Sequence, residues 1–409
     1  MAEWSQMTVG DCLVPLALRK MPKVLSRDYK STGSFPIVDQ GQNLVAGWTD
    51  DDGGLISTSQ PVVVFGDHTR TFKYVDFPFV RGADGTQVLK PKAGIDPLFF
   101  YYACRAIELP NRGYNRHFKA LKEREIAIPP LQEQRSIAQV LRQIDDALSV
   151  QDEQIQTAQA LKRAAMHSLF TRGLRGEAQK KTEIGPMPSG WKISSLGTLC
   201  EATDSVDLRS EGDRTIEYVD VSSISRDYLQ VETTSRHILK EAPGRARKRI
   251  LANDVIFATV RPTLLRTAIV PEEFDSQVCS TAFCVLRRDQ EKIADRFIYY
   301  LVQREQFVRQ LAEIETGASY PAVTDRMVKE QTVPLPPMDE QREVVAILHA
   351  IDRKIDLHRR KHAVLEELFK ALLHKLMTGE VRVGELGIGM LLGDTTAVTE
   401  AGGPVGNRV

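Results

Sequence analysis

Two stretches of the chain combine cationic, amide and aromatic side chains in a way that suits contact with a polyanion. They are Arg112–Lys119 and Thr316–Pro321, and each lies shortly before a Pro-Pro pair. Side chains of these types can hold phosphates and hydrogen-bond to base edges. The candidate nucleic-acid contacts in the two stretches are Arg112, Tyr114, Asn115, Arg116, His117, Lys119, Thr316, Gly317, Ser319 and Tyr320.

The densest basic cluster of the sequence is Gly244–Arg249, and a further arginine, Arg261, follows it. We add Arg245, Arg247, Lys248, Arg249 and Arg261 to the candidate contacts. Composition favours the alternative that all these segments are exposed loops of ordinary charge, because Lys+Arg and Asp+Glu both number 54 and the net charge is zero. A chain with no excess of positive charge should bind DNA weakly when it stands alone.

The residue patterns of common catalytic sites are absent from the sequence. It holds no GxxxxGK[ST] phosphate loop, no HExxH, no GxSxG and no GxGxxG after a strand. His358 and His362 are four apart on a helix, but no third metal ligand accompanies them, and Asp50–Asp52 precedes two glycines and is typical of a solvated turn. We therefore expect neither catalysis nor a bound metal or cofactor in this chain.

Length and composition indicate a globular protein of about two to four domains, since the chain has 409 residues of which 42% are hydrophobic. Its five cysteines form no CxxC pair, which indicates reduced thiols, most of them buried. The first residues do not resemble a signal peptide, and no apolar run reaches the 18 or so residues of a membrane span. A cytoplasmic location without membrane contact follows as the expectation.

The chain is an internal duplication. Ile128–Arg135 returns as Leu335–Arg342 at an offset of 207, and the match continues without a gap to Thr171 and Thr378, with 13 identities in 44 positions. Weaker matches lie upstream, where Val63–Phe65 resembles Val255–Phe257 and Phe99–Tyr102 resembles Phe297–Tyr300. The expected order is a first domain at 1–127, a long helix at 128–173, a linker at 174–190, a second domain at 191–334, a second helix at 335–380 and a poorly ordered tail at 381–409.

Each repeated helix is predicted to start after two prolines, with an acidic residue in its first turn. Apolar residues then alternate at spacings of four and three over more than four heptads, so two helices of roughly 60 Å carry stripes that should pack on each other. An antiparallel pair related by a pseudo-two-fold axis would place Gln151 beside His358, either as a buried polar layer or with both tilted to solvent. The residues expected to pair the helices are Leu141, Ile144, Leu148, Gln151, Leu348, Ile351, Ile355 and His358.

The two globular segments are predicted to be α+β. Strands are expected in Gln60–Gly66, Asn253–Val260 and Ser280–Leu286, and helices in Pro97–Glu108 and Asp295–Ile314. The predicted fold class is therefore α+β, with two tandem domains separated by two long antiparallel helices.

The repeated Pro-Pro-x-x-Glu-Gln-Arg motif with its helix resembles the specificity (S) subunit of type I restriction-modification enzymes. The likeness covers about residues 1–380 and includes Trp191–Gly197 and Glu315–Pro321. It implies a DNA-reading subunit without an active site, in which two target-recognition domains each read one half of a bipartite site in double-stranded DNA. It also implies two methyltransferase subunits and restriction subunits as partners, which bind S-adenosylmethionine, ATP and Mg²⁺.

Two other functions stay open at this point. An autonomous nuclease or methyltransferase lacks support because its motifs are missing, and a coiled-coil scaffold that binds only proteins gives no reason for two globular domains. If the helices act as a spacer, four residues inserted into one of them add about 6 Å. The gap of the recognised motif should then lengthen by one or two base pairs.

Overall fold

The computed structural model describes residues 4–18, 21–57, 59–82, 85–110, 116–317 and 319–386. The chain divides into two compact units. Unit 1 combines residues 1–152 with 360–409, and unit 2 consists of residues 153–359. Each unit therefore holds one globular domain and a part of each long helix.

The long helices are α3 (Leu131–Arg172) and α8 (Met338–Thr378), of 42 and 41 residues. Both start directly after a Pro-Pro pair, as predicted, and both carry acidic residues in the first turn, where they meet the positive end of the helix dipole.

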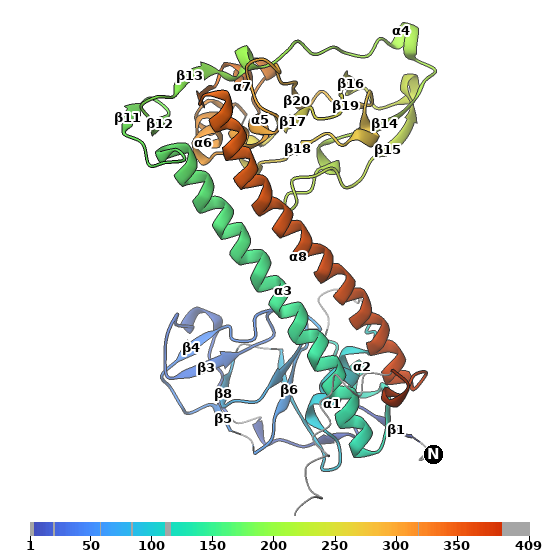
Figure 1. Ribbon diagram of the computed structural model, residues 1–409. Coiled ribbons are helices and arrows are strands. Elements are labelled where there is room, and N and C mark those ends of the chain that lie inside the picture. Colours follow the sequence, from blue (N-terminus) through green and yellow to red (C-terminus); the bar gives the residue numbers. More distant parts are fainter. Residues whose placement is uncertain are drawn as a thin grey trace, which may run out of the picture. The chain divides into compact units, whose positions relative to one another are not determined.

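The two helices pack antiparallel within each unit (Figure 1). In unit 1 the amino-terminal half of α3 contributes Ile137 and Leu141 to the same core as Phe369 and Leu376 of α8. In unit 2 the roles are exchanged, because Phe170 of α3 shares a core with Val344 and Leu348 of α8. The predicted pairing residues are all buried or half-buried: Leu141, Ile144, Leu148, Gln151, Leu348, Ile351, Ile355 and His358.

The predicted polar layer concerns two residues of different units. Gln151 belongs to unit 1 and His358 to unit 2, and both side chains are half-buried. Their mutual contact stays a prediction.

The globular domain of unit 1 contains two four-stranded sheets, in the orders β4-β3-β8-β5 and β2-β9-β6-β7. Helix α1 (Pro97–Arg105) packs on the second sheet, and Phe99, Phe100 and Tyr102 bury their rings there. The remaining elements are β1 (Ser5–Thr8), β2 (Leu13–Val14), β3 (Phe35–Val38), β4 (Gly47–Thr49), β5 (Leu55–Ile56), β6 (Val62–Gly66), β7 (Phe72–Val75), β8 (Phe79–Arg81), β9 (Thr86–Pro91), α2 (Phe118–Lys122) and β10 (Glu125–Ile128).

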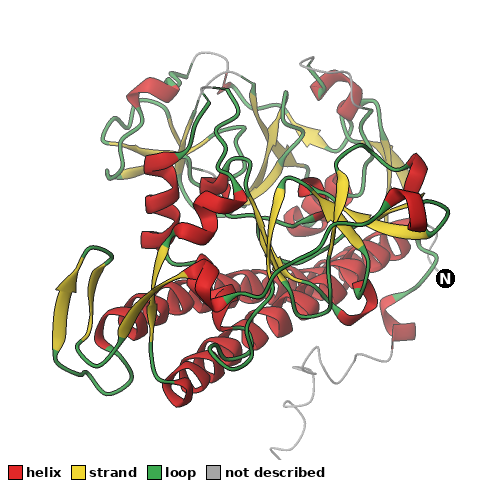
Figure 2. Ribbon diagram, turned by 90° about the horizontal axis from the view of Figure 1, so that it is seen from above, coloured by secondary structure: helices red, strands yellow, loops and turns green. Residues whose placement is uncertain are grey.

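The globular domain of unit 2 contains a four-stranded sheet, β15-β14-β19-β16, and a three-stranded sheet, β18-β17-β20. Many of these strands are labelled in Figure 1, and Figure 2 draws the strands in yellow and the helices in red. Its strands are β13 (Lys192–Ser195), β14 (Thr215–Val219), β15 (Ser235–Ile238), β16 (Ala246–Arg249), β17 (Val255–Ala258), β18 (Thr267–Ile269), β19 (Val278–Ser280), β20 (Phe283–Leu286) and β21 (Thr332–Leu335). Its helices are α4 (Leu208–Glu211), α5 (Phe297–Val302), α6 (Glu305–Ile314) and α7 (Asp325–Glu330).

The duplication extends through both domains. One sheet of each domain contains a parallel pair, β3 with β8 in unit 1 and β14 with β19 in unit 2, flanked by antiparallel strands. In the other sheet β6 pairs antiparallel with β7 and β9, as β17 does with β18 and β20. The weak sequence match between Val63–Phe65 and Val255–Phe257 therefore joins structurally equivalent strands.

A glutamine of the repeated motif fixes the start of each long helix to its domain. The Gln134 side chain accepts a hydrogen bond from the Asp96 N–H at 2.8 Å and donates to the carbonyls of Pro129 and Gly94 at 2.8 and 3.2 Å. The buried Gln341 repeats all three contacts, with the Ala294 N–H and the carbonyls of Pro336 and Lys292. A buried amide satisfied in this way fixes the position of the helix against the domain.

The glutamate of the same motif binds a tryptophan near the start of its domain. Trp4 Nε1 donates to Glu133 at 3.1 Å, and Trp191 Nε1 donates to Glu340 at 2.8 Å. The following strand then pairs with the strand before Pro-Pro, β1 with β10 and β13 with β21. The motif thus closes each domain by joining its first strand to its last.

Three segments differ from the sequence-based expectation. The linker at 174–190 contains a β-hairpin of β11 (Gln179–Thr182) and β12 (Gly185–Pro188), and Ile184 and Met187 bury apolar side chains in the core of unit 2. Residues 383–386 of the expected tail form a short 3-10 helix, and Arg382 just before it forms an ion pair with Glu133 at 2.6 Å. The rest of the tail, 387–409, lies outside the described residues.

The predicted helix over Asp295–Ile314 is two helices, α5 and α6. The break falls at Arg304, whose backbone is extended with φ −65° and ψ 134°. The change of direction allows Phe307 and Leu311 of α6 to bury their side chains in the core that α5 also lines.

Candidate nucleic-acid interface

Loop 316–322 and Arg261, two features that the sequence presented separately, lie together in unit 2. Thr316 and Val260 both form β-bridges with Ala322, and the Arg261 N–H donates to the Pro321 carbonyl at 2.7 Å. The loop turns at Gly317, whose φ of +101° favours glycine and where an added Cβ would lie 3.0 Å from the Tyr320 carbonyl oxygen. The backbone therefore fixes the loop beside Arg261.

The side chains of Arg261 and Tyr320 form an exposed pair. The guanidinium carbon of Arg261 lies 5.1 Å from the centroid of the Tyr320 ring, and Nη2 donates to the Ser319 carbonyl at 3.2 Å. Tyr320 is 72% exposed, and Thr316, Gly317 and Ser319 are exposed beside it. A cation held against an exposed aromatic ring can contact a phosphate or stack on a base.

Arg261 also has a backbone conformation that is uncommon for a residue with a side chain. Its φ is +49°, in the left-handed region, and the sparsely populated conformation costs energy that the surrounding structure must compensate. Backbone strain of this kind is frequent at functional positions, which agrees with Arg261 as a contact residue.

The basic cluster on β16 contributes less free positive charge than its sequence suggests. Lys248 donates to the Phe283 carbonyl at 2.6 Å and forms an ion pair with Asp325. Arg249 pairs with Asp204 at 2.8 Å and with Glu211 at 2.5 Å, and the hydrogen bond that Arg249 donates to Glu211 raises the pKa of the Arg249 guanidinium. Arg245 is exposed and Arg247, half-buried, donates to the Ala246 carbonyl.

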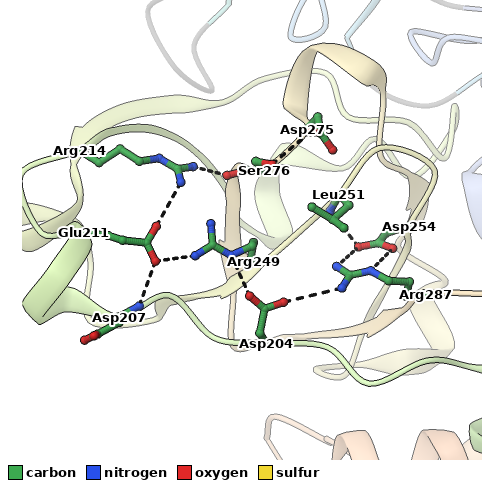
Figure 3. A network of polar contacts seen from close by, with 10 residues as sticks. All are labelled: Asp204, Asp207, Glu211, Arg214, Arg249, Leu251, Asp254, Asp275, Ser276 and Arg287. Atoms are coloured by element: carbon green, nitrogen blue, oxygen red, sulfur yellow. Dashed lines mark hydrogen bonds and ion pairs between the residues drawn. The ribbon is translucent and has the colours of Figure 1, made fainter.

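Arg249 belongs to a larger network of ion pairs (Figure 3). Asp204 lies between Arg249 and Arg287, and Arg287 also makes two hydrogen bonds to the buried Asp254, at 3.0 and 2.9 Å. Glu211 connects the network to Arg214. The predicted contacts Lys248 and Arg249 therefore stabilise their own domain, which leaves Arg245 and Arg247 as the better candidates of this cluster.

The basic and aromatic stretch of unit 1 is described only in part. Arg112, Tyr114 and Asn115 lie outside the described residues, and Arg116 and Lys119 are exposed. His117 differs from the expectation because it is buried: its backbone N–H donates to Asp67 Oδ1 at 2.7 Å, and its Nδ1 lies 3.0 Å from the Asp67 carbonyl oxygen. In this position His117 fixes the start of α2 and has no surface from which to reach a polyanion.

Two polar clusters that sequence reasoning missed join the domains to the helices. In unit 1 the Tyr102 hydroxyl donates to Asp145 at 3.3 Å, and Arg105 pairs with Asp145 at 3.0 Å and lies over the Phe369 ring at 4.7 Å. Burial, reinforced by Asp145, raises the pKa of the Tyr102 hydroxyl, which stays protonated as a donor.

The equivalent cluster in unit 2 takes its cation from a different element. The Tyr300 hydroxyl donates to Asp352 at 2.8 Å, but the ion pair to Asp352 comes from Lys162 of α3, at 2.7 Å. Lys162 is the repeat equivalent of Phe369, and Gln303, which stands where unit 1 has Arg105, accepts a hydrogen bond from Lys162 at 3.0 Å. Asp145 and Asp352 are identical positions of the repeat, and this identity could have indicated the site from the sequence.

The other sites considered from the sequence show no catalytic arrangement. Asp50 pairs with Lys30 at 2.8 Å and accepts from Ser34, as expected of a solvated turn. Over the described residues, no three of His, Cys, Asp or Glu come close enough to hold a metal ion. Within that same part of the chain, no helix has the length and apolar character to cross a membrane.

Comparison with known proteins identifies the family. The family described as type I restriction modification DNA specificity domain matches residues 1–159 and 188–367. The chain belongs to this family. The two matched segments each comprise one globular domain and most of the helix that follows it, so the family assignment and the structural duplication agree.

Relatives in the family are specificity subunits. The type I restriction enzyme MjaVIII specificity subunit of Methanocaldococcus jannaschii is 24% identical over 277 residues, which are 66% of this chain and 64% of that protein's length. The EcoR124I/EcoR124II specificity subunit of Escherichia coli is 21% identical over 84% of this chain and 89% of its own. The crystal structure of a type I S subunit from M. genitalium shares the fold, with a TM-score of 0.58, 16% identity and coverage of 91% and 96%.

Proposed function

We propose that this chain is the DNA-specificity subunit of a type I restriction-modification complex and reads a bipartite site in double-stranded DNA, with one half-site for each globular domain. It directs adenine methylation by two methyltransferase subunits and ATP-dependent restriction by further subunits in the cytoplasm. The chain itself is not an enzyme. S-adenosylmethionine, ATP and Mg²⁺ are bound by the partner subunits.

The observation that carries the proposal is the exposed Arg261–Tyr320 pair on a loop fixed by backbone hydrogen bonds, in a domain of the specificity family. Rigid support matters because base reading requires side chains in defined positions, whereas phosphate attraction alone does not depend on sequence. The near-neutral charge of the chain agrees with a subunit that binds DNA as part of a complex.

The proposal is tested by substituting Tyr320 and Arg261 in a complex with its methyltransferase subunits. Each lost base contact should cost about 1–3 kcal/mol and relax the preference at one or two positions of one half-site. The matched control is Tyr228→Ala, because Tyr228 is also exposed and also lies beside an arginine, Arg359, at 4.1 Å. The control should leave the methylated motif unchanged. If Tyr320→Ala and Arg261→Ala also leave it unchanged, loop 316–322 does not read bases.

The helices supply the second part of the proposal, the spacing between the half-sites. α3 and α8 are continuous over 42 and 41 residues, about 60 Å each at 1.5 Å per residue. Four residues inserted into α3 lengthen it by about 6 Å, so the gap of the methylated motif should grow by one or two base pairs. An unchanged gap in an active complex would contradict the role of the helices as a spacer.

A further inference from the structure

A cavity of about 1290 Å³ lies within unit 2, and the proposed function assigns it no role. The carboxyl-terminal half of α3, the amino-terminal half of α8 and the globular domain all contribute to its walls. This volume exceeds the roughly 300–1,000 Å³ that ligand sites commonly enclose, so the cavity has room for a small molecule.

The wall of this cavity holds a buried arginine, Arg304. It is only 8% exposed, and its guanidinium carbon lies 5.1 Å from the centroid of the Phe170 ring. Over the described residues no carboxylate or other acceptor binds its side chain. Burial lowers the pKa of Arg304 to about 10, so it remains a cation at neutral pH. A buried charge without a counterion is costly, and an anion in the cavity would remove that cost.

A second, independent feature is the start of α6, which lines the same cavity through Glu305 and Gln306. Arg304 occupies the N-cap position, where a side-chain acceptor normally binds the first N–H groups, and no side chain caps this helix. Glu305 in the first turn pairs with Arg309 instead, at 2.6 Å. The positive end of the α6 dipole therefore lies beside the Arg304 cation, and both favour an anion.

The other lining residues indicate the size of the ligand. Five carboxylates line the cavity beside seven Lys and Arg side chains, so the lining has a small excess of positive charge. A volume of about 1290 Å³ has room for a small anion but not for duplex DNA. Phe170, Leu265 and Ile269 give the walls apolar surface. We propose that the cavity of unit 2 binds a small organic phosphate, whose phosphate group is held by Arg304 and the start of α6 and whose apolar part packs on these walls. This inference does not depend on the proposed function.

Unit 1 provides an internal comparison. Where unit 2 has Arg304 and Phe170, the repeat places Ala106 and Met377, and the described residues of unit 1 contain no helix equivalent to α6. The proposed site thus belongs to one half of the duplication. Arg304→Ala gives unit 2 the residue of unit 1 at this position.

The test is isothermal titration calorimetry of the full chain with three probes: adenosine monophosphate, inorganic phosphate and adenosine. We expect adenosine monophosphate to bind most tightly and Arg304→Ala to weaken both phosphate-bearing probes at least about tenfold. The control Arg326→Ala removes a cation that is exposed, pairs with Glu330 and lies outside the cavity lining, so it should leave both affinities unchanged. Failure of both phosphate-bearing probes to bind at about 10 mM, or equal binding by Arg304→Ala, would overturn the proposal.

A second measurement separates ligand binding from packing. Arg304→Met preserves the contact with Phe170 but removes the buried charge. If Arg304 serves to bind an anion, the Tm of the ligand-free variant should therefore stay the same or rise. Adenosine monophosphate should raise the Tm of the unsubstituted chain but not that of Arg304→Met. A clear fall in the ligand-free Tm of Arg304→Met would show that Arg304 serves packing, and it would overturn the assignment.

Discussion

The clusters around Asp145 and Asp352 differ in which element supplies the cation that pairs with the aspartate. We predict that substitution can transfer this cation from the globular domain to the long helix. In unit 1 the cation on Asp145 is Arg105 of the globular domain, and Phe369 of α8 lies beside it. In unit 2 the cation is on the helix, as Lys162, and the domain supplies Gln303. The double variant Arg105→Gln/Phe369→Lys therefore gives unit 1 the arrangement of unit 2.

The magnitudes follow from the burial of the two side chains. Arg105→Gln leaves the Asp145 carboxylate, 29% exposed, without its ion pair, which should cost about 2 kcal/mol of local stability. Phe369→Lys removes a ring that is only 5% exposed and should cost about 3–5 kcal/mol. Because the new lysine can replace the lost arginine, the double variant should be less destabilised than the sum by about 1–2 kcal/mol.

The assay is hydrogen–deuterium exchange of the full chain, which gives local opening free energies for peptides of α1 and of α8 around Phe369. The control cycle combines Arg105→Gln with Leu368→Lys, because Leu368 is 44% exposed and adjacent in sequence but is not part of the cluster. Coupling no larger in the Phe369 cycle than in the Leu368 cycle would refute the equivalence of the two arrangements.

The remaining predictions concern the helix starts and the cysteines. Gln134→Leu removes three hydrogen bonds of a buried amide, which should cost about 2–4 kcal/mol and speed up hydrogen exchange in residues 92–99. The control Gln132→Leu, at an exposed position, should change little. Equal effects of the two variants would show that Gln134 does not anchor the helix start. Burial raises the pKa of Cys12 from 9.0 to about 11 and that of Cys200 to about 12, so iodoacetamide at pH 8 should leave both thiols unmodified until the chain unfolds. A raised thiol pKa stabilises the fold below pH 9, and this stabilisation is lost between pH 9 and about 11 to 12. Rapid labelling of the folded chain at pH 8, or unfolding free energies that do not fall over that alkaline range, would contradict the raised pKa values of these thiols.

Much of the architecture could be predicted because the helices repeat with few changes. The offset of 207 and the Pro-Pro start located α3 and α8, and the heptad positions identified the faces that the structure buries. The strand β6 and the helix α1 were also predicted, since continuous apolar runs between turn residues mark buried elements.

The rest depended on contacts between residues far apart in the sequence. The break at Arg304 has no proline or glycine to announce it, and Lys248 and Arg249 appeared available because their partners Asp325 and Asp204 lie 77 and 45 residues away. His117 was grouped with its basic neighbours, although Asp67, 50 residues earlier, holds it inside the domain. The proximity of Arg261 to Tyr320 also required the tertiary structure.

The role of this chain as a specificity subunit is tested most directly by a map of adenine methylation in the genome of a host that expresses the chain with its methyltransferase subunit, compared with the same host lacking the chain. We expect one bipartite motif that is methylated only when the chain is present, and a change within one half of that motif when Arg261 and Tyr320 are both replaced by alanine. Identical methylation with and without the chain, in a host where the two proteins form a complex, would contradict its role as a specificity subunit.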